Sequence, residues 1–224
     1  MSALVPAPRP LLVAFLAVTA LHVVAVAAGW SLLDTASKPF LVGLLLAWAW
    51  VASTGDPPRL LVIGLVFALL GDMLLEVDGT LWFLAGMGAF LVMQVCYIRG
   101  FAAMGAAARL RSAPWVVAAW VALWAALNVV IGPSLGALRW PILVYSLALT
   151  VMAATAAATG ERRIGVGGAV FLVSDLLIGL RAGGASIPAS GVLVMSTYCL
   201  AQYLIVTGWV ERARASVRQP HSAR

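Results

Sequence analysis

Two aspartates, Asp72 and Asp175, lie inside apolar segments that are long enough to cross a membrane. Each follows a small residue and precedes three large apolar residues, in the runs LGDMLL and VSDLLI. An acid within a bilayer costs at least roughly 2.5 to 3.5 kcal/mol on insertion scales, so such residues face the protein interior and usually have a function. The matched surroundings therefore predict a helical bundle in which the two carboxylates share one site.

The composition places nearly all of the chain in the membrane. Of 224 residues, 63% are hydrophobic and 10% are charged, which excludes an ordinary soluble domain. Most of the apolar stretches are long enough to span roughly 30 Å as helices, although the second is short. We expect an all-α integral membrane protein with one domain, residues 1–224, and eight transmembrane helices. The predicted helices are 11–29, 39–53, 60–76, 81–99, 115–131, 141–158, 164–181 and 190–210.

The basic residues indicate the orientation of these helices. Even-numbered crossings return the chain to the side of its N-terminus, and most basic residues fall on that side, so both termini are expected in the cytoplasm. Those residues are Arg9, Arg59, Arg99, Arg109, Arg111, Arg162, Arg163, Arg212, Arg214, Arg218 and Arg224, against Lys38, Arg139 and Arg181 on the other side. The net charge of +6 is thus a topology signal, and no basic stripe with interleaved aromatics indicates a nucleic-acid partner. The alanine- and arginine-rich composition favours a bacterial inner membrane.

The first predicted helix resembles a signal peptide in its early arginine and its small residues near the end. Its apolar run is longer than the core of a cleavable signal, so we expect it to be retained. The two cysteines, Cys96 and Cys199, follow their respective aspartates by the same number of residues. This coincidence suggests a parallel duplication of four plus four helices.

The predicted topology puts the two aspartates at one depth. The third and seventh helices run in the same direction, and each has its aspartate in its later half, toward the outer side of the membrane. Two carboxylates at one depth can divide their roles, one keeping a proton as the acid while the other is ionised as a base or charge stabiliser. That division suits acid-catalysed ether cleavage. The structural alternative is that each aspartate binds a helix terminus or neutralises a cation such as Lys38.

A set of short motifs extends along most of the chain. They are Lys38-Pro39 opening a helix, Leu70-Gly71-Asp72, Gly88-Ala89-Phe90 followed by Tyr97, Arg139-Trp140-Pro141-Ile142, Gly168-Ala169-Val170-Phe171 leading to Ser174-Asp175, and Tyr198 with Gln202. In this order and spacing they resemble the YhhN-like family of membrane proteins, whose mammalian members are lysoplasmalogenases. The resemblance covers about Lys38 to Ile205.

The resemblance implies an eight-helix hydrolase that cleaves the vinyl ether of a lysoplasmalogen to a fatty aldehyde and a glycerophospho-base. It also implies that Asp72 and Asp175 are the catalytic pair, without a metal or another cofactor, and that the partners are a lysophospholipid and the bilayer. The sequence sets no oligomeric state. Where family members commonly have histidine in the fourth helix, this chain has Gln94, which cannot shuttle protons but can hold a water or a substrate oxygen.

Polar residues near the two acids are candidates for substrate binding. Lys38 is placed to bind the substrate phosphate, with snorkelling to the interface as the alternative. Glu76 lies one helical turn after Asp72 and either tunes that acid or is solvated at the helix end. Tyr198 and Gln202 form one polar stripe on the last helix. Tyr145 and Ser174 complete the set.

Other functional classes match the chain less well. The two histidines, His22 and His221, are too few for a zinc hydrolase site, and no Gly-x-Ser-x-Gly elbow indicates a serine nucleophile. A proton-coupled transporter of a small or amphipathic solute is the main alternative, and it predicts helices broken in mid-membrane. A scaffold without activity explains the apolar helices but not the buried acids.

Overall fold

The computed structural model describes residues 9–54 and 56–218, and this part of the chain is helical, without a β-strand. Arg224 and His221 lie outside the described residues. The α-helices in these ranges are α1 (Arg9–Ala28), α2 (Ser31–Ala52), α3 (Arg59–Leu74), α4 (Thr80–Ala103), α5 (Ala106–Ser112), α6 (Pro114–Ile131), α7 (Arg139–Ala158), α8 (Arg162–Ala182) and α9 (Ser190–Arg218). Two single 3₁₀ turns, Gly132–Ser134 and Gly136–Leu138, join α6 to α7.

Each of the eight predicted apolar stretches coincides with a helix of the structure. Seven helices in the described ranges are long and apolar enough to cross a membrane. The remaining one, α3, has 16 residues and is about 24 Å long at 1.5 Å per residue, shorter than the roughly 30 Å of hydrocarbon. The architecture is that of a helical membrane protein, while the count of eight spans and the four-plus-four duplication stay predictions.

The start of the second helix was predicted wrongly. Lys38-Pro39 was expected to open it, because the apolar stretch begins there. Instead α2 begins at Ser31 and contains Pro39 in its interior. Gly29, with a φ of 69°, ends α1, and the Trp30 N–H donates to the Ala25 carbonyl at 2.9 Å, so the turn is tight and the next helix starts at once.

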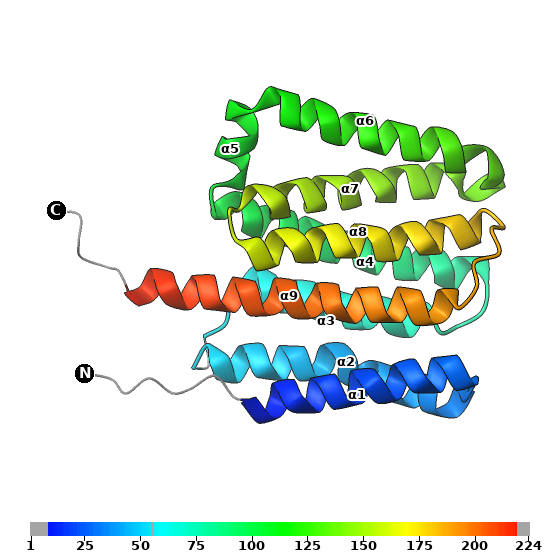
Figure 1. The fold of residues 1–224 in the computed structure, drawn as a ribbon, viewed down its shortest axis with the longest axis horizontal. Coiled ribbons are helices and arrows are strands. Elements are labelled where there is room, and N and C mark those ends of the chain that lie inside the picture. Colours follow the sequence, from blue (N-terminus) through cyan, green and yellow to red (C-terminus); the bar gives the residue numbers. More distant parts are fainter. Residues whose placement is uncertain (1–8, 55, 219–224) are drawn as a thin grey trace.

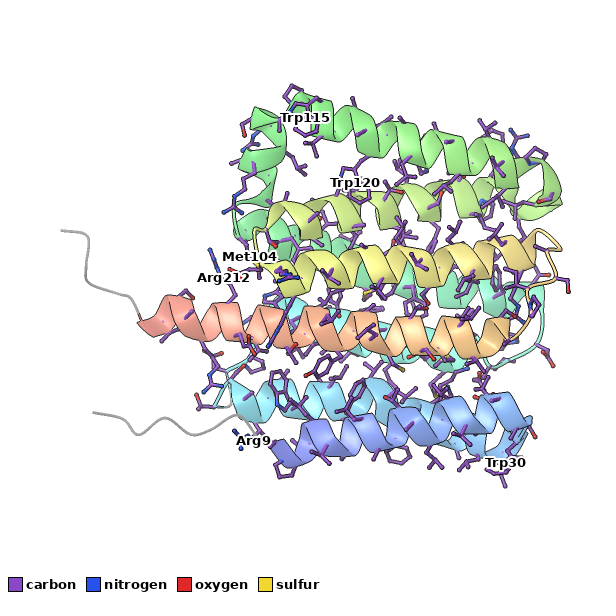
Figure 2. The ribbon with its side chains drawn as sticks, viewed as in Figure 1. Arg9, Trp30, Met104, Trp115, Trp120 and Arg212 are labelled. Carbon is purple, nitrogen blue, oxygen red and sulfur yellow. The ribbon has the colours of Figure 1, made fainter. Side chains whose placement is uncertain are left out.

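Apart from the short α5, which runs across them, the helices lie side by side along one long axis (Figure 1), with α1 and α2 at one edge and α6 at the other. Arg9 and Arg212 lie at the same end of the bundle, which we call the arginine-rich end, and Trp30 lies at the opposite end (Figure 2). The short helix α5 lies at the arginine-rich end, where Arg109 donates to the carbonyls of Ala158 and Thr159 at the end of α7. This basic contact satisfies carbonyls that a helix C-terminus leaves without partners.

Packing differs sharply between the centre and the edge of the bundle. The most extensive helix contacts join α8 to α9 and α3 to α4. Small residues permit these approaches: a Cβ placed on Gly167 of α8 would lie 3.1 Å from the Ala201 carbonyl oxygen of α9. By contrast, α6 has no buried residue and packs mainly on α7. The packed centre is therefore the part of the bundle that can fix polar groups within apolar surroundings.

Candidate active site

A cavity of about 690 Å³ opens into the half of the bundle opposite the arginine-rich end. Its walls come from helices α1–α4 and α6–α9. It contains seven of the nine side chains predicted for the site, and leaves out Gln94 and Gln202. The seven are Lys38, Asp72, Glu76, Tyr145, Ser174, Asp175 and Tyr198.

Asp72 is held at the packed centre of the bundle. It lies near the end of α3, is only 6% exposed, and accepts a hydrogen bond of 2.8 Å from the Tyr198 hydroxyl of α9 to its Oδ2 atom. Two further bonds extend this contact into the core, since Gln202 Nε2 lies 3.5 Å from the Tyr198 oxygen and the Tyr97 hydroxyl donates to Gln202 Oε1 at 2.9 Å. Asp72 thus ends a chain of buried hydrogen bonds across α3, α9 and α4.

The glycine before Asp72 makes this arrangement possible. A Cβ at Gly71 would lie 2.7 Å from the ring of Phe90 on α4, closer than real side chains come. Phe90 in turn meets the Tyr198 ring edge-on, with ring centroids 5.9 Å apart. Gly71 therefore allows the close approach of α3 and α4 that places Phe90 against Tyr198 and the Tyr198 hydroxyl on Asp72.

Asp175 has a tyrosine partner of its own, from a different helix. The Tyr145 hydroxyl of α7 donates to Asp175 Oδ2 on α8. Asp175 is half-buried rather than buried. Gln94 is fully buried beside Tyr145, and its carboxamide has no partner with hydrogen-bond geometry among the described residues. The two aspartates therefore share a cavity, and each accepts a hydrogen bond from a tyrosine. They differ in whether further hydrogen bonds of proper geometry lie behind that tyrosine.

The residue before Asp175 has another role than Gly71. The Ser174 hydroxyl is buried and donates to the Val194 carbonyl of α9 at 3.0 Å. This bond ties α8 to α9 next to the acid. Ser174 lines the cavity, but its hydroxyl hydrogen is used within the protein.

Charged residues gather at the mouth of the cavity. Lys38 forms an ion pair with Glu76, which also accepts a 3.0 Å hydrogen bond from Thr35. The partner of Lys38 is therefore Glu76 and not Asp72. Asp34 and Arg181 line the same mouth. The arrangement puts both signs of charge at one end of a cavity whose other walls are largely apolar.

Sequence reasoning missed a polar cluster on the edge helix. The Trp124 indole N–H donates to Ser146 Oγ at 3.1 Å, and Asn128 Nδ2 donates to the same oxygen at 3.2 Å. All three residues line the cavity and join α6 to α7. The signal was available, because an asparagine within an apolar stretch is unfavourable in lipid unless it faces a polar partner.

His22 of α1 is buried. Its Nδ1 atom lies 2.8 Å from Ser37 Oγ and 3.6 Å from Asp34 Oδ1, so serine and carboxylate share one ring nitrogen. A catalytic triad needs them on opposite nitrogens. Over the described ranges, no group of three or more His, Cys, Asp or Glu side chains is placed to hold a metal ion.

Comparison with known proteins agrees with the resemblance of the motifs. The sequence model of the YhhN family matches residues 33–209. Two proteins described as lysoplasmalogenase, from Mycobacterium bovis (strain ATCC BAA-935 / AF2122/97) and Mycobacterium tuberculosis (strain CDC 1551 / Oshkosh), are each 33% identical to this chain over 187 residues. The match covers 81% of this chain and 72% of each relative. No solved structure matches the chain.

Proposed function

The chain belongs to the YhhN family, and from that premise we propose that it is a lysoplasmalogenase-like hydrolase of the membrane. It cleaves the vinyl ether of a lysoplasmalogen to a fatty aldehyde and a glycerophospho-base. The observation that carries this proposal is the pair of aspartates in one cavity, each hydrogen-bonded to a tyrosine through one carboxylate oxygen. The lysoplasmalogenase relatives support the choice of ether lipid as substrate class.

The chemistry needs only groups that two carboxylates supply. A protonated carboxyl group donates its proton to the vinyl carbon that is not bonded to oxygen, which leaves an oxocarbenium ion at the neighbouring carbon. The ionised carboxylate stabilises this cation and accepts a proton from the attacking water. The resulting hemiacetal breaks its bond to the glycerol oxygen, which takes the proton from the second carboxyl group, while the hemiacetal hydroxyl gives its proton to the first. Aldehyde and alcohol then leave, and both carboxyl groups are back in their starting states. The net change is the addition of one water.

The tyrosine contacts support such a division of labour. In each pair the tyrosine donates to Oδ2, and no hydrogen bond to either Oδ1 atom occurs within the part of the chain that the structure describes. One oxygen of each carboxylate is therefore left for substrate or water. The tyrosine hydroxyls orient the acids and stabilise whichever of them is ionised.

The charged mouth suits the headgroup of the substrate. A glycerophospho-base has an anionic phosphate and, in the common headgroups, a cationic amine. Lys38 and Arg181 offer cations for the phosphate, and Glu76 and Asp34 offer carboxylates for the amine. With the headgroup at the mouth, the ether oxygen lies deeper, at the level of Asp72 and Asp175.

A transporter is the less favoured function. It would require helices broken at the site, with access from both faces of the membrane. Both α3 and α8 continue without a break through Asp72 and Asp175. Unbroken helices around a cavity that lies at one end of the bundle favour a reaction with a lipid over passage of a solute.

We also propose that the arginine-rich end faces the cytoplasm of a bacterium and that the cavity opens toward the outer side of its inner membrane. The test uses two exposed serines, Ser186 between α8 and α9 and Ser112 at the end of α5. Ser186→Cys is expected to react with a membrane-impermeant maleimide on intact spheroplasts, and Ser112→Cys only after lysis. Both native cysteines are buried, so background labelling is low. The reverse pattern would overturn the orientation.

The activity is tested with purified protein in nanodiscs. A vinyl-ether lysophospholipid is expected to yield aldehyde, measured with a hydrazine reagent. The saturated alkyl-ether lysophospholipid of the same length is the control, since it has no double bond to protonate. Absence of aldehyde from the vinyl ether, or equal release from both lipids, contradicts the proposal.

A further inference from the structure

A second cavity, of about 450 Å³, lies between α4 and α7. We call it the α4/α7 crevice, and its lining side chains are apolar apart from the Tyr145 hydroxyl and the Trp140 indole N–H. Met87, Gly88 and Leu91 form the α4 side, and Trp140, Val144 and Tyr145 form the α7 side. Trp140 is 69% exposed and Val144 59%, so the crevice lies at the outer face of the helices. In a membrane protein this face meets lipid chains.

The crevice adjoins the cavity that holds the aspartates. Met87 and Tyr145 line both spaces. Tyr145 also donates its hydroxyl to Asp175. A molecule that lies in the crevice and reaches past Met87 therefore arrives beside the hydroxyl and carboxylate of that pair.

The shape and chemistry of the crevice fit one kind of occupant. Along α4 it extends from Leu84 to Leu91, about 10 Å at 1.5 Å per residue. An unbranched hydrocarbon is narrow and needs no hydrogen bond, whereas a headgroup needs the charges that lie at the mouth of the other cavity. A lysolipid therefore fits with its head at the charged mouth and its chain in the crevice, with the bond between them near the two acids.

We propose that the α4/α7 crevice holds the hydrocarbon chain of the lipid substrate and forms its lateral passage between the bilayer and the two aspartates. This rests on the proposed hydrolase function. The fatty aldehyde leaves by the same passage, because it keeps the chain and loses the head. Chain carbons beyond about the first 10 Å extend into the surrounding lipid, so the crevice accepts chains of different length.

Gly88 keeps the crevice open. A Cβ built on it meets nothing within 4 Å, so a larger side chain there would fill the crevice rather than strike another helix. Its neighbours Ala89 and Phe90 are buried on the other side of α4. Gly43 on α2 is a matched control, since it is also a helix-interior glycine with open space around its Cβ and lines neither cavity.

The first experiment compares Gly88→Phe with Gly43→Phe on two vinyl-ether lysolipids, one with a 16-carbon chain and one with a 4-carbon chain. Gly88→Phe is expected to lower kcat/KM for the long chain at least tenfold and for the short chain less than twofold, because a short chain does not need the crevice. Gly43→Phe is expected to change neither by more than twofold. Equal losses on both chains in Gly88→Phe, or long-chain activity equal to that of the control variant, overturns the proposal.

The second experiment uses the wild-type protein and needs no catalysis. An alkyl-ether lysolipid with a diazirine in mid-chain, which the enzyme cannot cleave, is photolysed in nanodiscs, and the labelled residues are identified by mass spectrometry. Labelling of Leu91 or Val144, which line only the crevice, that an excess of unlabelled lysolipid displaces supports the crevice. Displaceable labelling of Leu127 and Ile131 on α6, without the crevice residues, overturns it. Crevice labelling by a protein that releases no aldehyde would contradict the hydrolase function alone.

Discussion

The two aspartates of the cavity each accept a hydrogen bond from a tyrosine, but the hydrogen bonding beyond the two tyrosines differs. Behind the Asp72 and Tyr198 pair, Gln202 and Tyr97 continue the hydrogen bonds into the packed core. Behind the Asp175 and Tyr145 pair lies Gln94, whose amide makes no bond of proper geometry to any described residue. Behind Tyr198 the hydrogen bonds continue into the core, whereas behind Tyr145 no hydrogen bond of proper geometry follows among the described residues.

This difference follows the packing of the bundle. Tyr198 lies on α9, which is buried along much of its length, and its ring is fixed by Phe90 and Phe171. Tyr145 lies on α7, lines both the main cavity and the α4/α7 crevice, and is half-buried, whereas Tyr198 is buried. The comparison indicates that one acid is a fixed element of the core, while the partner of the other adjoins the crevice that we propose for the substrate chain.

The largest expected effect comes from the acids themselves. Asp72→Asn and Asp175→Asn keep the size of each side chain but remove its acid-base capacity, so aldehyde release should fall at least roughly 100-fold in each. Circular dichroism and the melting temperature in detergent serve as fold controls. Full turnover in either variant would show that the corresponding aspartate is not part of the catalytic pair.

The tyrosines test whether the unequal support matters for the reaction. Tyr198→Phe and Tyr145→Phe each remove a hydrogen bond to a carboxylate, of about 1.5 to 3 kcal/mol, and activity should fall roughly 10- to 100-fold in both. Only Tyr198→Phe should also lower the melting temperature clearly, because it leaves Gln202 without this contact in the core. Equal melting temperatures for the two variants would contradict the inference that Tyr198 contributes more to the stability of the core than Tyr145 does.

Much of this arrangement was predictable from the sequence because lipid imposes simple rules. Apolar length located the helices, and the unfavourable placement of Asp72 and Asp175 in apolar segments marked the candidate site. Helix direction then put both acids at one end of the bundle. These inferences need only the order of residues along the chain and the thickness of a membrane.

The remainder depends on contacts that no local pattern encodes. Tyr145 was a candidate without an assigned partner, because its contact with Asp175 depends on how α7 packs on α8. The start of α2 was misplaced because the predicted bounds followed the apolar stretch, whereas the turn at Gly29 sets the boundary. Asn128 was missed since its partner Ser146 lies on the next helix.

The small residues before the two acids should differ in their effect on stability. Gly71→Ala puts a Cβ against the Phe90 ring at 2.7 Å, which should destabilise the fold by about 1 to 3 kcal/mol through overpacking and displace Tyr198 from Asp72. Ser174→Ala removes one hydrogen bond to a backbone carbonyl and should lower stability by about 1 kcal/mol. Thermal unfolding in detergent measures both. A Gly71→Ala protein as stable as wild type would mean that α3 and α4 can separate without loss.

The smallest effects, and the most direct test of the comparison, come from the two glutamines. Gln202→Leu leaves the buried Tyr97 hydroxyl without its acceptor and should lower stability by about 1 kcal/mol, with a loss of activity up to about fivefold. Gln94→Leu replaces a buried amide that has no bond of proper geometry, so its effect on stability should be neutral or slightly favourable. The two substitutions are identical in chemistry and both sites are buried, so only the hydrogen bonding differs. If Gln94→Leu destabilises the protein as much as Gln202→Leu, then Gln94 supports Tyr145 as Gln202 supports Tyr198, and the two acids are equally held.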